Sequence, residues 1–329
     1  MRVKPNCISP DLDLRELGIS IPTSSTPTPT PPVTVRLFAG TDGGGVFRSE
    51  DEGTSWTAVN TGLTNLVVGC MVVTALDDIL IGIGAGKGVF RSSNNGDSWV
   101  AKNSGYDPFA TPQSMLVSGS VVFLGTPEYN PLLYKSTNNG DTWTRKDTGL
   151  PNKSVRAIAN MNNILFAGTY GSGSYKSING ADNWSAAKTG MASLQVYSFL
   201  TSGSVIFAGT TNHIEKSTDN GDNWTTVHTS ASNNDYTDFA KIGTTLFSCA
   251  TNQIGVVRST DGGDTWAQCA SGLPASRAVN ALAVSGSTLF AGETLYGVYK
   301  STDLGDNWVA VNNGLTNTKI KRLLVKPVI

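Results

Sequence analysis

Short apolar runs alternate with clusters of Gly, Asn, Asp and Ser along most of the chain. The stretch VNALAVSGSTLFAGETLYGVYKSTDLGDNWVAVNNGL (279–315) shows the pattern most clearly. Runs rich in Val, Leu, Phe, Tyr and Trp that end at turn-forming residues are typical of β-strands. The stretch therefore predicts four short strands with tight turns, which we place at 279–284, 288–292, 297–301 and 307–311.

An octapeptide falls at the turn between the third and fourth of these strands, and it recurs along the chain. Its seven copies are SEDEGTSW (49–56), SSNNGDSW (92–99), STNNGDTW (136–143), SINGADNW (177–184), STDNGDNW (217–224), STDGGDTW (259–266) and STDLGDNW (301–308). Their first serines lie 40 to 44 residues apart, and a period near forty is the signature of a solenoid or a propeller. Because a four-stranded antiparallel sheet cannot bury its faces alone, the repeats predict an all-β, seven-bladed β-propeller over residues 34–329.

The residue types of the octapeptide predict a structural role. Asp219 can accept hydrogen bonds from backbone N–H groups of its own turn, and Gly221 can supply a positive φ. Trp224 can pack between neighbouring sheets while its indole N–H finds an acceptor. The fourth copy has Ala181 in place of the glycine, and an unchanged backbone there would cost roughly 1 kcal/mol. The equivalent positions are Asp51, Asn94, Asn138, Asn179, Asp219, Asp261 and Asp303, followed by Trp56, Trp99, Trp143, Trp184, Trp224, Trp266 and Trp308.

The pattern Ser-x-Asp-x-Gly-x-Thr-Trp resembles the Asp-box, or BNR repeat, of sialidases, xyloglucan-active glycosidases, sortilin-type receptors and photosystem II assembly factors. The resemblance covers 34–329. It implies that the octapeptide is a structural hairpin, usually on the face opposite an active site, and it does not specify a function. Neither a calcium loop nor a zinc site has the required ligand spacing, so no metal and no cofactor are expected.

The two ends of the repeat predict how the ring closes. The segment VRLFAGT (35–41) matches the second strand of a blade, with no first strand before it, and KIKRLLVK (319–326) matches an extra first strand. The C-terminal strand should therefore complete the blade that the N-terminal strand starts, which leaves no open edge.

Composition and charge exclude several classes of function. A net charge of −1 argues against nucleic-acid binding, which requires a concentrated basic surface. The basic residues before the octapeptides fit solubility and protection of strand edges better than a binding groove; they are Arg48, Arg91, Lys135, Lys176, Lys216, Arg258 and Lys300. The cysteines show no paired spacing, although a Cys249–Cys269 bond within one blade stays open. No membrane-spanning run and no secretory leader are seen, so membrane insertion is not expected.

The N-terminal region does not follow the repeat. SPDLDLRELG (9–18) has a Ser cap, Pro at the first helical position and a closing Gly, so it predicts a helix too short to be stable alone. A Thr/Pro-rich tract follows and predicts an extended spacer. We therefore divide the chain into a docking peptide (1–21), a linker (22–33) and the propeller. Leu12, Leu14 and Leu17 are the expected anchors to a partner protein that orders 1–33, and a flap folded on its own propeller is the alternative.

A ligand site is expected on the face formed by the loops that join second to third strands and successive blades. Aromatic rings beside amides and acids there could bind a surface glycan or a protein. The candidates are Asp42, Tyr106, Phe109, Glu128, Tyr129, Tyr170, Asn212, His213, Gln253, Glu293 and Tyr296.

The sequence favours a protein that is not an enzyme. A glycosidase needs two carboxyls about 5–10 Å apart. The acids outside the octapeptides that could supply them have no local signature; they are Asp42, Asp107, Glu128, Asp238 and Glu293. The Arg-Ile-Pro tripeptide of sialidases is absent, and two histidines make a His-based triad improbable.

These observations lead to a hypothesis of function with two alternatives. The chain would be a propeller that binds a ligand or decorates a larger assembly, tethered by its N-terminal peptide, with a virion or other extracellular particle as the favoured setting. One alternative is a free-standing assembly factor similar to the photosystem II assembly propellers. The other is a glycoside hydrolase.

Overall fold

The structure of the protein is a computed structural model that describes residues 35–107, 110–127, 133–231, 233–252, 254–275 and 278–328. Residues Thr34–Ile329 form one compact unit. The predictions for the docking peptide and the linker, including Leu12, Leu14 and Leu17, lie outside the described residues and are not tested.

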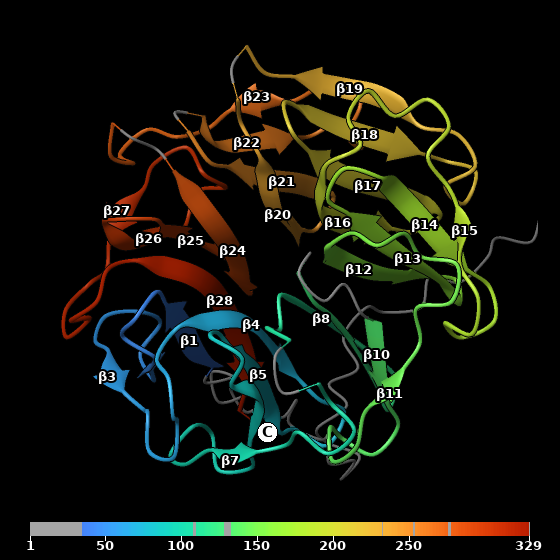
Figure 1. The fold of residues 1–329 in the computed structure, drawn as a ribbon. Helices are drawn as coiled ribbons and strands as arrows, with labels where there is room; N and C mark the ends of the chain where they lie inside the picture. Colours follow the sequence, from blue (N-terminus) through green and yellow to red (C-terminus); the bar gives the residue numbers. More distant parts are fainter. Residues whose placement is uncertain are drawn as a thin grey trace, which may run out of the picture. The chain divides into compact units, whose positions relative to one another are not determined.

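Seven four-stranded antiparallel sheets surround a central axis, which confirms the predicted seven-bladed propeller (Figure 1). Blade 1 contains β28 (Ile320–Pro327), β1 (Val35–Thr41), β2 (Val46–Ser49) and β3 (Thr57–Ala58). Blade 2 contains β4 (Val68–Val73), β5 (Ile79–Ile83), β6 (Gly88–Ser92) and β7 (Val100–Ala101). Blade 3 contains β8 (Ser114–Ser118), β9 (Val121–Gly125), β10 (Leu133–Ser136) and β11 (Thr144–Arg145). Blade 4 contains β12 (Val155–Met161), β13 (Ile164–Thr169), β14 (Gly173–Ser177) and β15 (Ser185–Ala186).

The remaining three blades repeat the same order from the axis outward. Blade 5 contains β16 (Val196–Ser202), β17 (Val205–Thr210), β18 (His213–Ser217) and β19 (Thr225–Thr229). Blade 6 contains β20 (Tyr236–Ile242), β21 (Thr245–Ala250), β22 (Gly255–Ser259) and β23 (Ala267–Gln268). Blade 7 contains β24 (Val279–Ser285), β25 (Thr288–Glu293), β26 (Gly297–Ser301) and β27 (Val309–Ala310).

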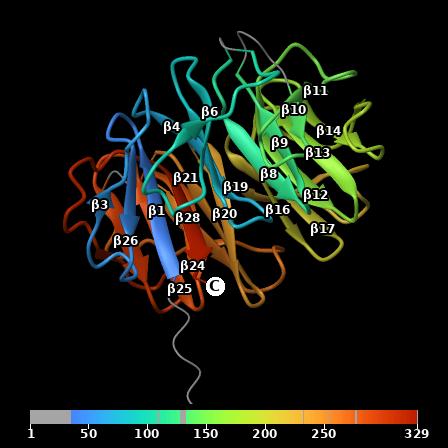
Figure 2. The ribbon, with the colours of Figure 1, turned by 90° about the horizontal axis from the view of Figure 1, so that it is seen from below.

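The ring closes as the sequence predicts. β28, near the C-terminal end, pairs antiparallel with β1 from Val35↔Pro327 to Thr41↔Ile320, and the two strands lie side by side in both views (Figures 1 and 2). Buried Lys326 of β28 also forms an ion pair with Asp77 in the β4–β5 turn of the next blade. Blade 1 is therefore held by both ends of the repeat.

The outer strand of blade 7 is shorter than the sequence pattern predicts. It is Val309–Ala310 instead of 307–311. The reason is the backbone N–H of Trp308, which donates to Ser271 O of the preceding blade at 2.9 Å and not to the neighbouring strand. Trp308, the residue before the outer strand, therefore forms a backbone hydrogen bond between blades 6 and 7.

The octapeptide folds as a self-contained hairpin end. Ser217 Oγ donates to Asp219 Oδ1 (2.8 Å) and accepts from Gly221 N (2.9 Å), while Asp219 Oδ1 accepts from Asn223 N (2.9 Å). The bonds from the Asn223 backbone and side chain, then from Ser217, lower the pKa of Asp219 to about 2. Gly221 has φ +78° and Ala181 has φ 76°, so both expectations for the turn are confirmed.

The tryptophans join neighbouring blades. Trp224 is buried, and its indole Nε1 donates to Ala187 O of the preceding blade at 2.9 Å. Its carbonyl lies against Gly190, where an added Cβ would approach the oxygen to 2.3 Å. Trp266 differs, because its indole donates to Gly263 O of its own turn at 3.3 Å. The interface between blades 5 and 6 therefore lacks the indole bond that crosses the other six.

The basic residues before the octapeptides also act between blades. Each reaches the turn of the next blade, as Lys216 does to Asp264 (2.6 Å) and Lys300 does to Glu52 (2.9 Å) across the ring closure. In blade 3, Lys135 instead donates to Gly180 O (3.1 Å). This ring of contacts assigns these side chains a specific structural role beyond the general one expected from sequence.

The hydrophobic core is divided among the blade interfaces. One cluster contains Phe38 and Val46 of blade 1 with Ile79, Ile81 and Trp99 of blade 2. Cys249 and Cys269 lie together in the cluster between blades 6 and 7 as free thiols, so they are not bonded. Each blade buries its faces only against its neighbours, as the repeat analysis expected.

Candidate functional site

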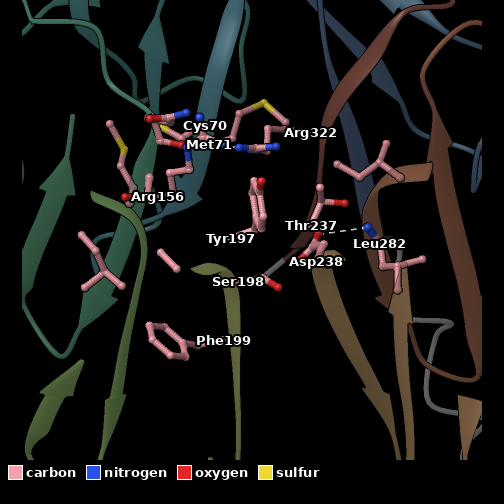
Figure 3. A pocket seen from close by; sticks show the side chains of 16 residues that line it. Cys70, Met71, Arg156, Tyr197, Ser198, Phe199, Thr237, Asp238, Leu282 and Arg322 are labelled. Carbon is pink, nitrogen blue, oxygen red and sulfur yellow. Dashed lines mark hydrogen bonds between the residues drawn. The ribbon is translucent and has the colours of Figure 1, made fainter. Parts of the chain in front are cut away.

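A polar cavity of about 290 Å³ is lined by residues of the innermost strands, and Figure 3 shows these side chains. Its lining comes mainly from the first half of the seven innermost strands, which begin at the face opposite the octapeptide turns. Prominent among the lining side chains are Arg156, Tyr197, Asp238 and Arg322, which belong to four different blades. We call this the mouth cavity.

Bulges in the inner strands place side chains at this mouth. The register of β12 against β13 runs from Val155↔Thr169 to Ala157↔Gly168, which leaves Arg156 unpaired. β16 leaves out Tyr197 and β20 leaves out Thr237 in the same way. Equivalent shifts occur in β4, β24 and β28. Since a bulge bends a strand and re-aims its side chains, it explains how strands that build the core also supply the cavity.

Arg156 is the least satisfied charged group of the cavity. Its guanidinium carbon lies 3.9 Å from the ring centroid of Tyr170 and 5.1 Å from that of Tyr197. Its Nε is buried and has no hydrogen-bond partner. Within the described ranges no carboxylate lies at ion-pair distance from it. The two rings stabilise the cation through cation–π contacts.

Tyr197 is held by a polar network behind the cavity. Its hydroxyl lies 3.2 Å from Thr211 Oγ1, whose single O–H has two acceptors within reach, Gln195 Oε1 (2.8 Å) and Asp235 Oδ1 (2.9 Å). Burial raises the pKa of Tyr197 to about 12, so the phenol stays neutral at physiological pH. The ring is therefore a fixed, uncharged wall beside Arg156.

Arg322 and Asp238 supply the other charges. Arg322 donates to Lys321 O (2.8 Å) and Gln113 O (3.4 Å). The carboxylate of Asp238 accepts from the backbone N–H groups of Phe239 (2.8 Å) and Leu282 (3.0 Å), the second drawn in Figure 3. Burial raises the pKa of Asp238 to about 6, although the two N–H bonds and Arg322 oppose this shift.

The cavity has limited means for covalent chemistry. Asp238 is the one carboxylate among its lining residues. Burial raises the pKa of the Cys70 thiol, which also lines the cavity, to about 12, so it is not an activated nucleophile. Among the described residues, no three His, Cys, Asp or Glu side chains meet as a metal site would require. The arrangement favours recognition of a polar ligand.

The residues predicted from sequence fall into different environments. Tyr170 is the candidate that contacts the cavity, through Arg156. Asp42 lines a separate hollow of about 290 Å³ with Lys319 and Lys321, and it lies 3.7 Å from Lys321 Nζ. Tyr296 is 50 % exposed on the loop between β25 and β26. These three lie on the predicted face.

Other candidates have structural contacts. Tyr106 is buried against Tyr134 and donates to Ala110 O at 2.9 Å. Glu293 is fully buried, and its carboxylate accepts from the N–H groups of Leu295 and Tyr296 in its own turn. Asn212 Oδ1 accepts from Asn234 N at 3.0 Å, and His213 Nδ1 lies 3.2 Å from Thr229 Oγ1. Phe109, Glu128, Tyr129 and Gln253 lie outside the described residues.

Sequence reasoning did not identify Arg156, Tyr197 or Arg322. Arg156 and Tyr197 occupy the position just after the first residue of an inner strand. Thr237, Asn280 and Lys321 are its equivalents, so a polar residue recurs at this position, whereas β4 has Gly69 there. This repeat-relative position was the available signal for Arg156 and Tyr197, whereas Arg322 is the third residue of β28 and does not share it.

Comparison with solved structures defines the class of fold. A xyloglucanase of family GH74 from Xanthomonas campestris is similar with a TM-score of 0.64 at 17 % identity, covering 84 % of this chain and 52 % of that one. YCF48 bound to a D1 peptide is similar with a TM-score of 0.56 at 16 % identity, covering 73 % and 79 %. The chain thus spans about half of the xyloglucanase.

The particular family is not shown by sequence. No protein-family profile matches the chain, and no curated protein matches it. An extracellular domain of a putative hybrid two-component system from B. thetaiotaomicron is also similar, with a TM-score of 0.63 at 18 % identity, covering 82 % of this chain and 36 % of that one. At these identities the likeness shows a seven-bladed β-propeller and nothing finer. The described part of the chain has no helix long and apolar enough to span a membrane.

Proposed function

We propose that this protein is a non-enzymatic binding module that holds its ligand at the mouth cavity. The observation that carries the proposal is the guanidinium of Arg156 in a polar cavity, where no carboxylate of the described residues pairs with it. A hydrogen bond to a charged group contributes about 1.5–3 kcal/mol, so a ligand that supplies an acceptor to this guanidinium would be held. The surrounding rings hold Arg156 in place before any ligand arrives.

The arrangement of acids supports binding over hydrolysis. Hydrolysis of a glycoside requires two carboxyls across the scissile bond. In the mouth cavity Asp238 is the single carboxylate among the lining residues, and both of its oxygens accept backbone N–H groups. The similarity to a xyloglucanase keeps glycoside hydrolysis as the alternative that an experiment must address.

The hairpin geometry supports the Asp-box assignment made from sequence. The Ser-to-acid bond and the acid-to-backbone bond recur, for example at Ser217 and Asp219, Ser259 and Asp261, and Ser301 and Asp303. In this account the octapeptides build the ring and do not bind ligand.

The N-terminal region completes the proposal. We assign residues 1–21 to docking on a larger assembly, with a virion or another extracellular particle as the setting, and residues 22–33 to the spacer. This rests on the sequence pattern of a short helix followed by a Thr/Pro tract. The propeller would then be displayed away from the surface that carries it.

Two assays on the full chain test the proposal. Binding to a printed glycan array should be retained by Arg145→Gln, an exposed arginine outside the cavity, and reduced by Arg156→Gln. Incubation with xyloglucan and with aryl glycosides should release no product above background. If product is released by the parent protein and not by Asp238→Asn, the protein is a hydrolase and the binding-module proposal is wrong.

A further inference from the structure

The interface between blades 5 and 6 lacks a pair of hydrogen bonds that the other six interfaces share. At those six, the backbone N–H of the octapeptide tryptophan donates to a carbonyl of the segment that connects the preceding blade to its own, at 2.8–2.9 Å. The indole N–H of the same tryptophan donates to a second carbonyl of the preceding blade, also at 2.8–2.9 Å. We call these two bonds the rim clamp. Trp266 forms neither bond with a described residue of blade 5.

The sequences of the connecting segments explain why this clamp is missing. Six segments carry Thr, Ser or Asn, then Gly, then a large apolar residue; they are TGL (61–63), SGY (104–106), TGL (148–150), TGM (189–191), SGL (271–273) and NGL (313–315). Their glycines have φ between +76° and +92°, and an added Cβ would approach the carbonyl oxygen of the next tryptophan to 2.2–2.3 Å. Between blades 5 and 6 the same positions are Thr229, Ser230 and Ala231. Since Ser230 has a Cβ, this segment cannot pass the tryptophan so closely, and β19 continues to Thr229 instead.

The neighbouring strand of blade 5 favours the same change. Where the third strand begins, blades 1, 2 and 7 have Gly45, Gly88 and Gly297, and an added Cβ there would lie 2.2–2.3 Å from an Asn Oδ1 of the connecting segment. Blade 5 has His213 at this position. The segment therefore cannot approach the strand as it does in those blades, and it pairs as a strand, with His213 opposite Thr229.

Other contacts between blades 5 and 6 are kept. Ser198 Oγ donates to Tyr236 O between the inner strands β16 and β20 (2.8 Å), and Lys216 pairs with Asp264 on the octapeptide face (2.6 Å). Trp266 is 9 % exposed, whereas the other six octapeptide tryptophans are 3–5 % exposed. The interface therefore differs from the other six at the outer rim.

We infer that the propeller opens first at the outer rim between blades 5 and 6, about a hinge formed by the inner strands β16 and β20. Each blade of such a ring is held by its two neighbours, so the interface with the fewest bonds between blades separates at the lowest cost. The opening is local, because the contacts of the inner strands persist while the outer strands part. The inference is independent of the proposed function, since no ligand takes part.

Hydrogen–deuterium exchange of the full chain without ligand tests the inference, under conditions in which exchange reports the free energy of opening. The strands that flank the interface, β18–β19 and β22–β23, are compared with β6–β7 and β26–β27, whose blades have the rim clamp on both sides. After correction for intrinsic rates, the first set should exchange about tenfold or more faster, because two hydrogen bonds are missing there. Equal rates in the two sets, or faster exchange in the second set, overturn the inference.

Reciprocal variants test whether the connecting segment is the cause. Ser230→Gly combined with Ala231→Leu gives this segment the Thr-Gly-Leu sequence of a clamped one, and it should slow exchange in β18–β19 and β22–β23 about fivefold or more. Gly190→Ser places a Cβ 2.3 Å from Trp224 O, and it should accelerate exchange in β14–β15 by a similar factor. Gly203→Ser is the matched control, because Gly203 also has a positive φ (+62°) and an added Cβ there meets no atom within 4 Å.

The outcomes of these variants are decisive in either direction. If the Ser230→Gly/Ala231→Leu protein exchanges as fast as the parent, the inference is wrong. The same holds if Gly190→Ser accelerates exchange in β14–β15 no more than Gly203→Ser does. Should Gly190→Ser fail to fold, the parent protein and the Ser230→Gly/Ala231→Leu variant decide the question by themselves.

Discussion

The two faces of the propeller differ in how their charged side chains are paired. On the octapeptide face, acids and bases have partners in their own turn or in the next blade, as Asp219 and Lys216 do. At the mouth, Arg156 has aromatic neighbours and no acceptor, and Asp238 is buried with a raised pKa. The difference teaches that the most conspicuous sequence motif builds the ring, while the proposed binding site uses side chains that differ from blade to blade.

Removing the closing strand should have the largest effect on this architecture. Deletion of 318–329 removes β28, exposes the edge of β1 and breaks the Lys326–Asp77 ion pair. We expect the truncated chain to be largely unfolded at room temperature. Heating it should then show no cooperative unfolding transition by circular dichroism or calorimetry. A truncated protein that melts at the parent temperature would show that the ring does not depend on this strand.

A single methyl group in an octapeptide should have the next largest effect. Gly221→Ala places a Cβ at φ +78° and 2.6 Å from Phe166 Cε1, so we expect a loss of about 1–3 kcal/mol in the free energy of unfolding. Denaturant unfolding measures the loss. The reverse change at the equivalent position, Ala181→Gly, should cost little or nothing because Ala181 already has φ 76°. Equal losses in both variants would contradict the argument.

The two faces should also differ in the sign of their pH dependence. The pKa of Asp219 is lowered to about 2, so its stabilisation is present above pH 4 and is lost as pH falls through 2. The pKa of Asp238 is raised to about 6, so its folded form takes up a proton between pH 6 and 4 and stability from this group rises as pH falls.

Asp238→Asn isolates the mouth contribution. The stability difference between the parent and the variant should shrink by about 1–2 kcal/mol as pH rises from 4 to 7, because the parent must then bury a charge. Thermal melts at closely spaced pH values measure this. A difference that stays constant over the range would show that the Asp238 carboxyl titrates normally.

Removing residues 1–33 should have the smallest effect. If the segment docks on another assembly, its deletion should leave the melting temperature of Thr34–Ile329 within about 1 °C, since it would contribute no contacts to the ring. A clear drop in melting temperature would favour the alternative in which the segment folds on its own propeller.

The sequence predicted the fold far better than the site. The period of the octapeptides, the missing first strand at 35–41 and the extra strand at 319–326 determined blade number and closure, because each blade repeats one local pattern. The interblade bonds of Trp224 followed from the same pattern. The repeat pattern did not predict the mouth cavity. Arg156 and Arg322 belong to blades that are far apart in sequence, and they line one cavity only when the ring closes. Tyr106 was chosen as a loop aromatic, yet the structure buries it.

One paired measurement tests the central claim that the mouth cavity binds the ligand and that the octapeptide face stabilises the ring. Arg156→Gln and Lys216→Gln each remove one positive charge, from the mouth and from the opposite face. Both variants are compared for binding to the glycan array and for melting temperature. The account predicts that Arg156→Gln abolishes binding at an unchanged or higher melting temperature, whereas Lys216→Gln costs about 1 kcal/mol of stability and leaves binding intact. Loss of stability without loss of binding in Arg156→Gln would contradict it.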